Sequence, residues 1–381
     1  MYFMKRHTIL LVAIFLLAPV FQYAQGLNRE ECENVRNKII GEWAEKYSDH
    51  FYQNIELLRI KRGENSMPIW GSIFGEEPAD GRSLWISMHG GGNAPQELND
   101  EQWNNQKVLY EPNEGVYVCP RAPWNDWNMW FQEPIDAILE ELIQTMVVTQ
   151  NVNPDKVYIM GYSAGGDGVW RLAPRLADHW AAAAMMAGHP GDVGLENVRN
   201  LPFTIWVGGD DDAYNRNIEV AKRGQELDKL HKSDRNGYIH ETHVLMGLPH
   251  WMERKDTAAV GWMSKYVRNL RPNKVVWKQE EVTRRYFYWL GAPEGEIARG
   301  MTVIARYDKN RIDIDQCDYS SLTIYLDDEM MNLDIPVEIF YMKKNIATIT
   351  PERSEKVMRN VLDERGDIRA VFCCKIDLKL N

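Results

Sequence analysis

Apolar residues follow two alternating patterns between residues 84 and 245 of this chain. Short continuous apolar runs, typical of buried strands, are separated by longer segments in which apolar positions recur at the spacing of a helix face. The predicted strands cover 84–88, 116–119, 156–160, 181–187, 203–207 and 242–245. The predicted helices in this region cover 135–148, 165–176 and 217–230, and one more helix is predicted before it, over 28–52. This alternation predicts an α/β fold, in which helices cover both faces of a mostly parallel sheet.

The pattern changes beyond residue 272, where short apolar runs alternate with turn residues and one helix is predicted over 354–362. The predicted strands here are 275–277, 285–290, 302–307, 312–315, 322–326, 337–341 and 370–378. Many short strands with turn signals between them are typical of a small β-sandwich. We therefore predict a catalytic domain over 26–272, which includes the first helix, and a β-rich, sandwich-like domain over 273–381.

The amino terminus has the features of a secretory signal peptide. Lys5 and Arg6 precede an apolar run over residues 9–21, which is short for a membrane-spanning helix. The small residue Ala24 follows, and cleavage near Ala24 or Gln25 would remove residues 1–25. We therefore expect a secreted or periplasmic protein that keeps no stable membrane span after cleavage. A retained membrane anchor is the alternative.

Composition and charge narrow the classes of function. The chain has 381 residues, of which 44% are hydrophobic, and its formal net charge is -11. A net negative charge spread along the chain argues against general binding to nucleic acid. The number of cysteines is odd, five in all, and their spacing matches no metal motif, so we predict no disulfide framework and no metal site. Cys373 and Cys374 are adjacent in a predicted strand, and we expect both to be buried on opposite faces.

The sequence Gly161-Tyr162-Ser163-Ala164-Gly165 matches the turn that presents a nucleophilic serine between a strand and a helix. The strand predicted over 156–160 leads into it, and the helix predicted over 165–176 leaves it. A Cβ atom at either flanking glycine would crowd so tight a turn. Ser163 is therefore the predicted nucleophile, and the start of the helix favours developing negative charge.

A serine hydroxyl needs a base, and in this type of site the acid and then the histidine follow the serine along the chain. Three downstream histidines lie beside or within predicted regular elements: His231, His240 and His243. His250 instead lies in a loop after a strand, which is where a catalytic base is expected. We predict His250 as the base.

The acid is expected in the loop that follows the strand predicted over 203–207. That loop contains three adjacent carboxylates, Asp210, Asp211 and Asp212. A Gly-x-x-Asp pattern that begins at Gly208 favours Asp211, and the other two remain alternatives.

A glycine cluster directly follows the strand predicted over 84–88. Glycine lets the backbone approach a substrate oxygen closely, and backbone N–H groups stabilise the negative charge that develops there. We predict the N–H groups of Gly91, Gly92 and Ala164 as the oxyanion donors. His89 is expected to hold the glycine loop through hydrogen bonds.

Aromatic residues are concentrated in the loop that follows the strand predicted over 116–119, at the sheet edge where ligands bind in this architecture. Tryptophan faces stack on sugar rings and on aromatic acyl groups. The candidate substrate-binding residues are Trp124, Trp127, Trp130 and Trp251. A structural role for these side chains is the alternative.

The motifs at 89–92, 161–166, 211 and 247–251 together resemble secreted α/β-hydrolases of the polyhydroxybutyrate-depolymerase and feruloyl or acetylxylan esterase type. The resemblance covers about residues 85–266 and implies the α/β-hydrolase fold, esterase chemistry and no cofactor. It implies a small-molecule or polymeric ester as substrate, linked to plant polysaccharide or of the polyester type. A serine peptidase of the same fold and a catalytically inactive carbohydrate-binding protein are the alternatives.

Overall fold

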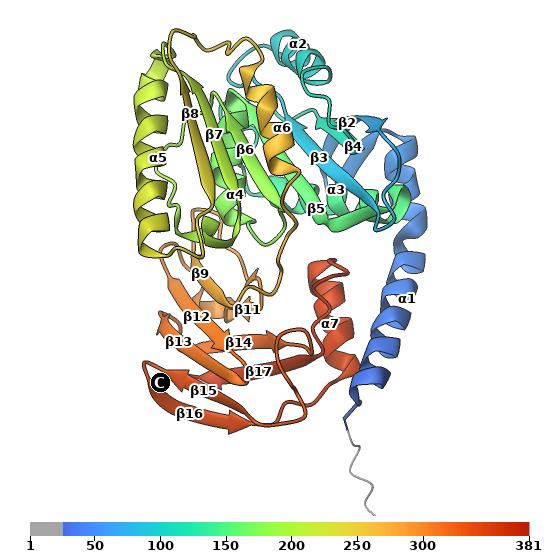
Figure 1. The fold of residues 1–381 in the computed structure, drawn as a ribbon. Helices are drawn as coiled ribbons and strands as arrows, with labels where there is room; N and C mark the ends of the chain where they lie inside the picture. The colour runs from blue at the N-terminus through green and yellow to red at the C-terminus, as the bar shows by residue number, and fades with distance from the viewer. Residues whose placement is uncertain (1–25, 381) are drawn as a thin grey trace, which may run out of the picture.

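An eight-stranded sheet lies at the centre of the larger part of the molecule, in a computed structural model that describes residues 26–380 (Figure 1). The predicted signal peptide lies outside these residues. The strand order is β1-β2-β4-β3-β5-β6-β7-β8. Neighbouring strands from β4 to β8 are parallel, whereas β1 and β2 are antiparallel to their neighbours. The strands are Arg59–Arg62, Asn65–Phe74, Arg82–Met88, Gly115–Pro120, Val152–Tyr162, Ala182–Met186, Phe203–Gly208 and His240–Leu245, numbered β1 to β8 in that order.

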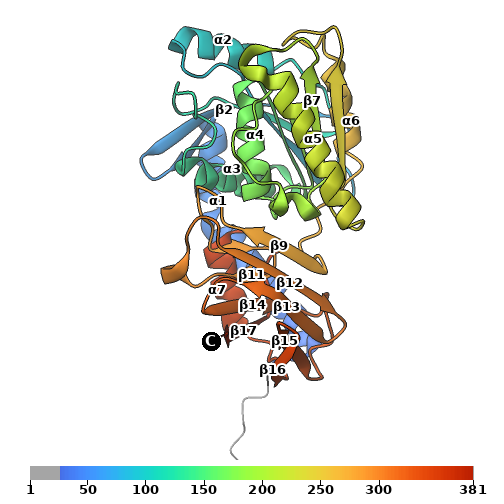
Figure 2. The ribbon, with the colours of Figure 1, turned by 90° about the vertical axis from the view of Figure 1, so that its left-hand side faces the viewer.

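Each face of the sheet buries its own apolar layer, because successive side chains of a strand point to opposite faces. In β3, Leu84 and Ile86 belong to one buried cluster, and Trp85 between them belongs to the other. The first face is covered by α3 (Pro134–Gln150), α4 (Ala164–Arg175) and α5 (Arg216–Ser233), of which Figure 2 shows α4 and α5 in front of the strands. The short helix α6 (Ala258–Met263) packs on the second face. This arrangement confirms the predicted fold class, that of the α/β-hydrolases.

Several elements depart from the prediction. The strands β1 and β2 and the helix α2 (Gln96–Gln106) were not predicted. In β2 only Met67 and Ile69 are buried, and the strand includes Pro68, so it lacks the continuous apolar run that marks the central strands. The strand β1 pairs only with residues 65–68 of β2, so residues 69–74 pair with β4 alone and lie at the edge of the sheet, where such a pattern is tolerated.

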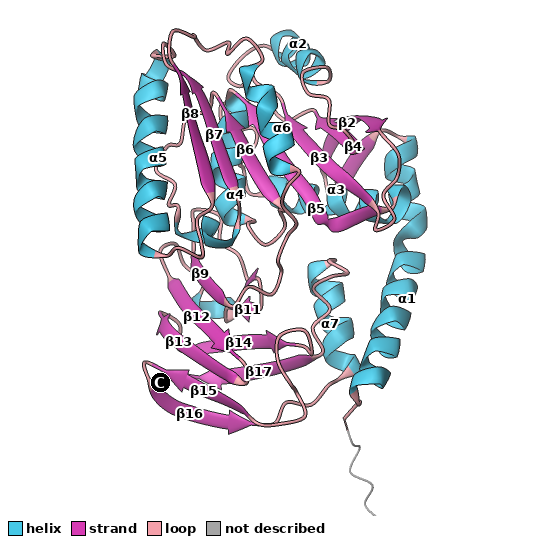
Figure 3. Ribbon diagram, in the orientation of Figure 1, coloured by secondary structure: helices cyan, strands magenta, loops and turns pink. Residues whose placement is uncertain are grey.

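The carboxyl-terminal part contains two further sheets, as Figure 3 shows by its strand colouring. A five-stranded sheet has the order β16-β15-β13-β12-β9, and a four-stranded sheet has the order β10-β11-β14-β17. The helix α7 (Glu355–Arg365) is capped by Ser354. The strands β9 to β17 are Lys274–Lys278, Tyr286–Phe287, Leu290–Gly291, Thr302–Asp308, Arg311–Cys317, Ser321–Leu326, Val337–Tyr341, Lys344–Ile349 and Cys374–Lys379.

Two of the predicted strands in this part are wrong in their extent. The run over 285–290 is a tight hairpin, β10 and β11, with Tyr288 at its turn at φ 53°. The run over 370–378 becomes a strand only from Cys374, because the N–H groups of Ala370 and Phe372 bond within the preceding segment rather than to another strand. The strand β16 was not predicted, since most of its residues are exposed and none is buried.

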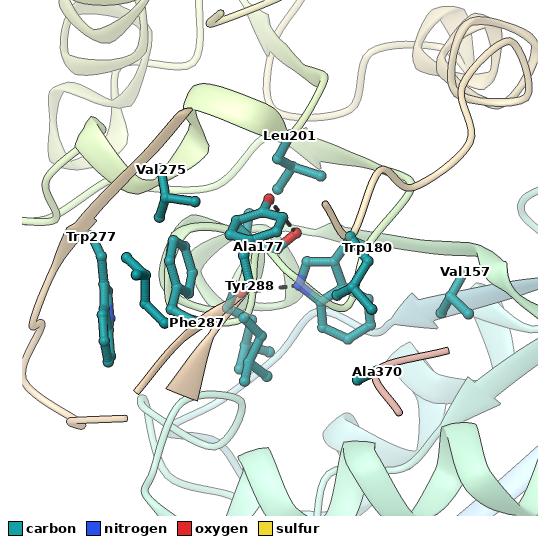
Figure 4. Close-up of a cluster of buried hydrophobic side chains, with 14 of the residues drawn as sticks. Val157, Ala177, Trp180, Leu201, Val275, Trp277, Phe287, Tyr288 and Ala370 are labelled. Carbon is teal, nitrogen blue, oxygen red and sulfur yellow. Dashed lines mark hydrogen bonds between the residues drawn. The ribbon is translucent and has the colours of Figure 1, made fainter. Parts of the chain in front are cut away.

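The two parts share a buried apolar interface, which Figure 4 shows in close-up. Trp277 and Phe287 of the carboxyl-terminal sheets lie in the same cluster as Trp180 of the larger part. The hydroxyl of Tyr288 donates to the carbonyl of Ala177 over 3.1 Å. The helix α1 (Arg29–Glu56) runs along one side of both parts and contacts α3 and α7 (Figure 1). Over residues 26–380, none of the helices is long and apolar enough to cross a membrane.

Candidate active site

The turn between β5 and α4 places Ser163 at the carboxyl edge of the sheet. Ser163 has φ 56° and ψ -119°, a conformation that is strained for a residue with a side chain. A Cβ atom on Gly161 would lie 2.3 Å from the carbonyl oxygen of Gly165. A Cβ atom on Gly165 would lie 2.1 Å from the carbonyl oxygen of Met88, at the end of β3. Glycine at both positions therefore lets the turn close and lets the helix approach the sheet.

Three predicted residues from separate loops come together in a line of hydrogen bonds. The Nε2 atom of His250 lies 3.0 Å from the Oγ atom of Ser163. The Nδ1 atom of His250 lies 2.7 Å from the Oδ2 atom of Asp211. With the ring proton on Nδ1, His250 donates to Asp211 and accepts from the serine hydroxyl. This is the geometry of a nucleophile, a base and an orienting acid.

The loop that carries Asp211 and the loop that carries His250 contact each other closely through their backbones. The N–H group of Asp210 donates to the carbonyl of Leu248 over 3.0 Å. A Cβ atom on Gly208 would lie 2.1 Å from the carbonyl oxygen of Pro249, so only glycine permits this approach. The hydroxyl of Tyr162 donates to the carbonyl of His250 over 2.6 Å, which ties the histidine loop to the serine turn.

Arg216, at the start of α5, is a site residue that the sequence did not reveal. Its Nη1 atom donates to the Oδ1 atom of Asp211 over 2.6 Å and lies 3.2 Å from the Nδ1 atom of His250. Burial would raise the pKa of Asp211, but the hydrogen bond from His250 and the charge of Arg216 hold that pKa below its ordinary value. Asp211 is therefore ionised at neutral pH and able to balance a positive charge on His250.

The glycine loop is held by two buried side chains. The N–H group of Gly92 donates to the Oδ1 atom of Asn99 over 2.8 Å. The Nδ2 group of Asn99 donates to the carbonyls of Ala94 and Pro95. The Nδ1 atom of His89 hydrogen-bonds to the carbonyl of Gly90, and its Nε2 atom accepts from the N–H group of Ala122. Burial lowers the pKa of His89 to about 3, so this ring is neutral.

The three predicted oxyanion donors differ in whether their N–H groups are already hydrogen-bonded. The N–H group of Gly92 donates to the Oδ1 atom of Asn99, so it does not point to a substrate oxygen. The N–H group of Gly91 has no partner among the described residues. Ala164 is the first residue of α4, where an N–H group has no acceptor within the helix. Gly91 and Ala164 both line a cavity that also includes Ser163.

Two cavities meet at Ser163. One of about 410 Å³ is lined by Gly90, Tyr162, His250 and Trp251, among others. The other, of about 460 Å³, is lined by Gly91, Ala164, Trp127 and Arg216, among others. A substrate that spans both cavities would place its reacting carbonyl beside the serine hydroxyl.

The predicted tryptophans have different environments. Trp127 is 62% exposed and Trp251 is 48% exposed, and each lines one of the two cavities. Trp130 is fully buried and donates its indole N–H to the carbonyl of His89. The prediction that Trp130 binds substrate is therefore wrong, because its ring supports the glycine loop from within. Trp124 is half-buried against the core and lines neither cavity.

Searches for related proteins gave matches only among solved structures. No family model and no curated protein matches the chain. A thermostable esterase shares 19% identity over 55% of this chain and 62% of its own length, with a TM-score of 0.41. A phospholipase/carboxylesterase from Dyadobacter fermentans shares 17% identity over 53% of this chain and 97% of its own length, with a TM-score of 0.39.

A third solved structure is a peptidase. Dipeptidyl peptidase 4 of Porphyromonas gingivalis shares 14% identity over 55% of this chain and 35% of its own length, with a TM-score of 0.39. Likeness at these identities and TM-scores carries no information about the activity or the substrate of this chain.

Proposed function

We propose that this chain is an exported serine hydrolase that cleaves carboxylic esters through an acyl-enzyme intermediate. The observation that carries the proposal is the line of hydrogen bonds from Ser163 through His250 to the buried Asp211. A hydroxyl, an imidazole and a carboxylate in this order activate a serine for attack on an acyl carbon.

The proposed reaction begins when the Oγ atom of Ser163 attacks the ester carbonyl while the Nε2 atom of His250 takes its proton. Asp211 keeps the ring oriented and balances the positive charge that forms on it. The N–H groups of Gly91 and Ala164 stabilise the negative oxygen. His250 then gives its proton to the leaving alcohol. In the second half of the reaction, water gives a proton to His250 and attacks the acyl carbon, and His250 returns the proton to the Oγ atom of Ser163 as the acid leaves.

The two cavities suggest how an ester is oriented. The leaving alcohol must lie within reach of His250, and His250 lines the cavity that contains Trp251. We assign that cavity to the alcohol part and the cavity with Trp127 to the acyl part. An exposed tryptophan on each side favours esters whose two parts present sugar or aromatic faces, which fits esters linked to plant polysaccharides.

Turnover of a substrate panel by the purified chain tests the function. The panel contains acetyl, feruloyl and hydroxyalkanoate esters together with peptide amides. We expect ester hydrolysis by the wild type and a loss of several orders of magnitude in Ser163→Ala. Ser264→Ala, which removes an exposed hydroxyl near α6, is the matched control.

Other results of this panel would contradict the proposal. Cleavage of amides in preference to esters would favour a peptidase. A folded wild type that binds polysaccharide and turns over none of the substrates would favour a carbohydrate-binding protein.

Export is a separate part of the proposal, because residues 1–25 lie outside the described residues. It rests on the basic start and the apolar run of the sequence. Amino-terminal sequencing of the exported chain should begin within a residue or so of Gln25. A chain that keeps Met1 and sediments with membranes would support the anchor instead.

A further inference from the structure

A cluster of sulfur atoms lies where the two ends of the described chain meet. Cys32 belongs to the first turn of α1, Cys373 directly precedes β17, and Cys374 begins that strand. All three side chains are at most 1% exposed. The Sγ atoms of Cys32 and Cys373 and a carboxylate oxygen of Asp328 lie within 4.8 Å of one another.

From this arrangement we propose that Cys32 and Cys373 form a disulfide that fastens α1 to the carboxyl-terminal sheets. The proposal goes beyond the hydrolase function and rests on export only for the oxidising environment in which such bonds persist. Both thiols are free in the structure, and an S–S bond of about 2 Å requires their sulfur atoms to approach from a separation of at most 4.8 Å.

The start of α1 is already docked at the place where the bond would form. The Nε group of Arg36 donates to the carbonyl of Val371 over 3.2 Å. The N–H group of Leu27 donates to the carbonyl of Arg353 over 3.4 Å. The bond would therefore join segments that the fold brings together without it, and it would close a loop of almost the entire chain.

Cys374 is a poorer partner for Cys373, although their sulfur atoms are 3.9 Å apart. Neighbouring Cα atoms are about 3.8 Å apart across a trans peptide, which is shorter than the separation of about 4.4–6.8 Å usual for a disulfide. The thiol of Cys374 also has a closer acceptor, the carbonyl of Glu352 at 3.1 Å, than the thiol of Cys373, whose acceptor is the carbonyl of Leu326 at 3.8 Å.

A structural zinc ion is also a poorer fit to this cluster. Such a site takes four ligands, and a carboxylate among them must have an oxygen that is free to bind the metal. Both carboxylate oxygens of Asp328 accept hydrogen bonds from the guanidinium of Arg353, at 2.8 and 2.6 Å. The neutral disulfide needs no charge in this buried place.

Oxidation requires an external disulfide, either a dithiol oxidoreductase in its oxidised form or glutathione disulfide. One cysteine thiolate attacks a sulfur of that disulfide, forms a mixed disulfide and releases one external thiolate, which takes up a proton. The second cysteine thiolate attacks the protein sulfur of the mixed disulfide and releases the other external thiolate, which is protonated in turn. Two electrons and two protons thus pass to the external pair, and one S–S bond forms in the chain.

The timing of this reaction follows from burial. The neighbouring thiol of Cys373 and burial raise the pKa of Cys32, and burial contributes to a raised pKa of Cys373 as well. Neither thiol forms a thiolate readily in the native fold. We expect the bond to form while the chain folds, before α1 is docked, and to resist reductants afterwards.

Peptide mapping of the full chain tests the proposal. The chain is unfolded, refolded in a buffer of reduced and oxidised glutathione, quenched with acid and alkylated under denaturing conditions without reduction. Trypsin should then release a linked pair of peptides, 30–36 and 370–375. The link should persist in Cys374→Ala and disappear in Cys373→Ala. Cys119 and Cys317 should be alkylated completely and serve as internal controls.

Thermal unfolding of wild type refolded under oxidising and under reducing conditions provides a second readout, which compares two samples of the same sequence. Oxidised wild type should unfold about 5 °C or more above the same protein after reduction, and Cys32→Ser should show no such difference. Complete alkylation of Cys32 in refolded wild type would overturn the proposal. A link between Cys373 and Cys374, or one zinc per chain that is lost in Cys32→Ser, would overturn it equally.

Discussion

Replacement of Arg216 by methionine tests how the acid of the site is held. The substitution keeps most of the side-chain length but removes the donor to the Oδ1 atom of Asp211. The side chains of Arg216 and Asp211 are only 10% and 1% exposed, so solvent does not replace the lost contact. A buried acceptor without its donor costs about 1–3 kcal/mol. Asp211 keeps His250 as a partner, so we expect a loss of about 2 kcal/mol at pH 7.

The pH dependence of this loss has a definite sign. The pKa of Asp211 in the folded chain lies below its ordinary value, despite burial, because of His250 and Arg216. A group of this kind contributes stability that is present above its unfolded pKa of about 4 and is lost as the pH falls through its folded pKa. The advantage of wild type over R216M should therefore be full at pH 7 and shrink below about pH 4.

Urea unfolding at several pH values measures this difference, and Arg171→Met is its control. Arg171 lines the same cavity as Arg216, but it pairs with Asp192, whose side chain is 65% exposed. Such a pair contributes at most about 1 kcal/mol. A loss in R216M no larger than in R171M, or one that stays constant down to pH 3.5, would refute the reasoning.

Three further predictions concern the loops around the site. Asn99→Asp replaces a donor to two carbonyls with a carboxylate, so kcat should fall by about 10–1,000-fold with little change in KM in steady-state kinetics; an unchanged kcat would show that the glycine loop does not depend on this side chain. Trp130→Ala should lower the free energy of unfolding by about 3–5 kcal/mol, whereas Trp127→Ala should raise KM and leave stability within about 0.5 kcal/mol; equal stabilities would contradict their different environments. Gly165→Ala should abolish activity and destabilise the chain, because the new Cβ atom would lie 2.1 Å from the carbonyl oxygen of Met88. Gly261→Ala should be tolerated in both assays, because a Cβ atom at residue 261 would have no atom within 4 Å.

The strands β3 to β7 were predictable because nearly all of their residues are buried and read as continuous apolar runs. The strand β7 is buried at every position, and its predicted and observed ranges nearly coincide. The strand β2, which lies near the edge of its sheet, and the exposed strand β16 were missed because partly solvated strands carry no such run. The hairpin at Tyr288 was missed because nothing in its local sequence marks the turn, which uses a tyrosine at positive φ.

The site was predictable where a residue type is required at a fixed place along the chain. A nucleophile between a strand and a helix, and a histidine in a later loop, led to Ser163 and His250. Asn99 and Arg216 act on the site through contacts that exist only after folding, so no local pattern marks them. Trp130 was misassigned because a cluster of aromatic residues in a loop does not reveal which rings point into the core.

Covalent labelling of the nucleophile tests the central claim most directly. A fluorophosphonate probe reacts with a serine only when the hydroxyl is activated by a base. We predict that wild type gains one label, which tandem mass spectrometry places on Ser163, and that Ser163→Ala and His250→Ala gain none. A folded wild type that remains unlabelled, or a label that persists in Ser163→Ala, would contradict the account.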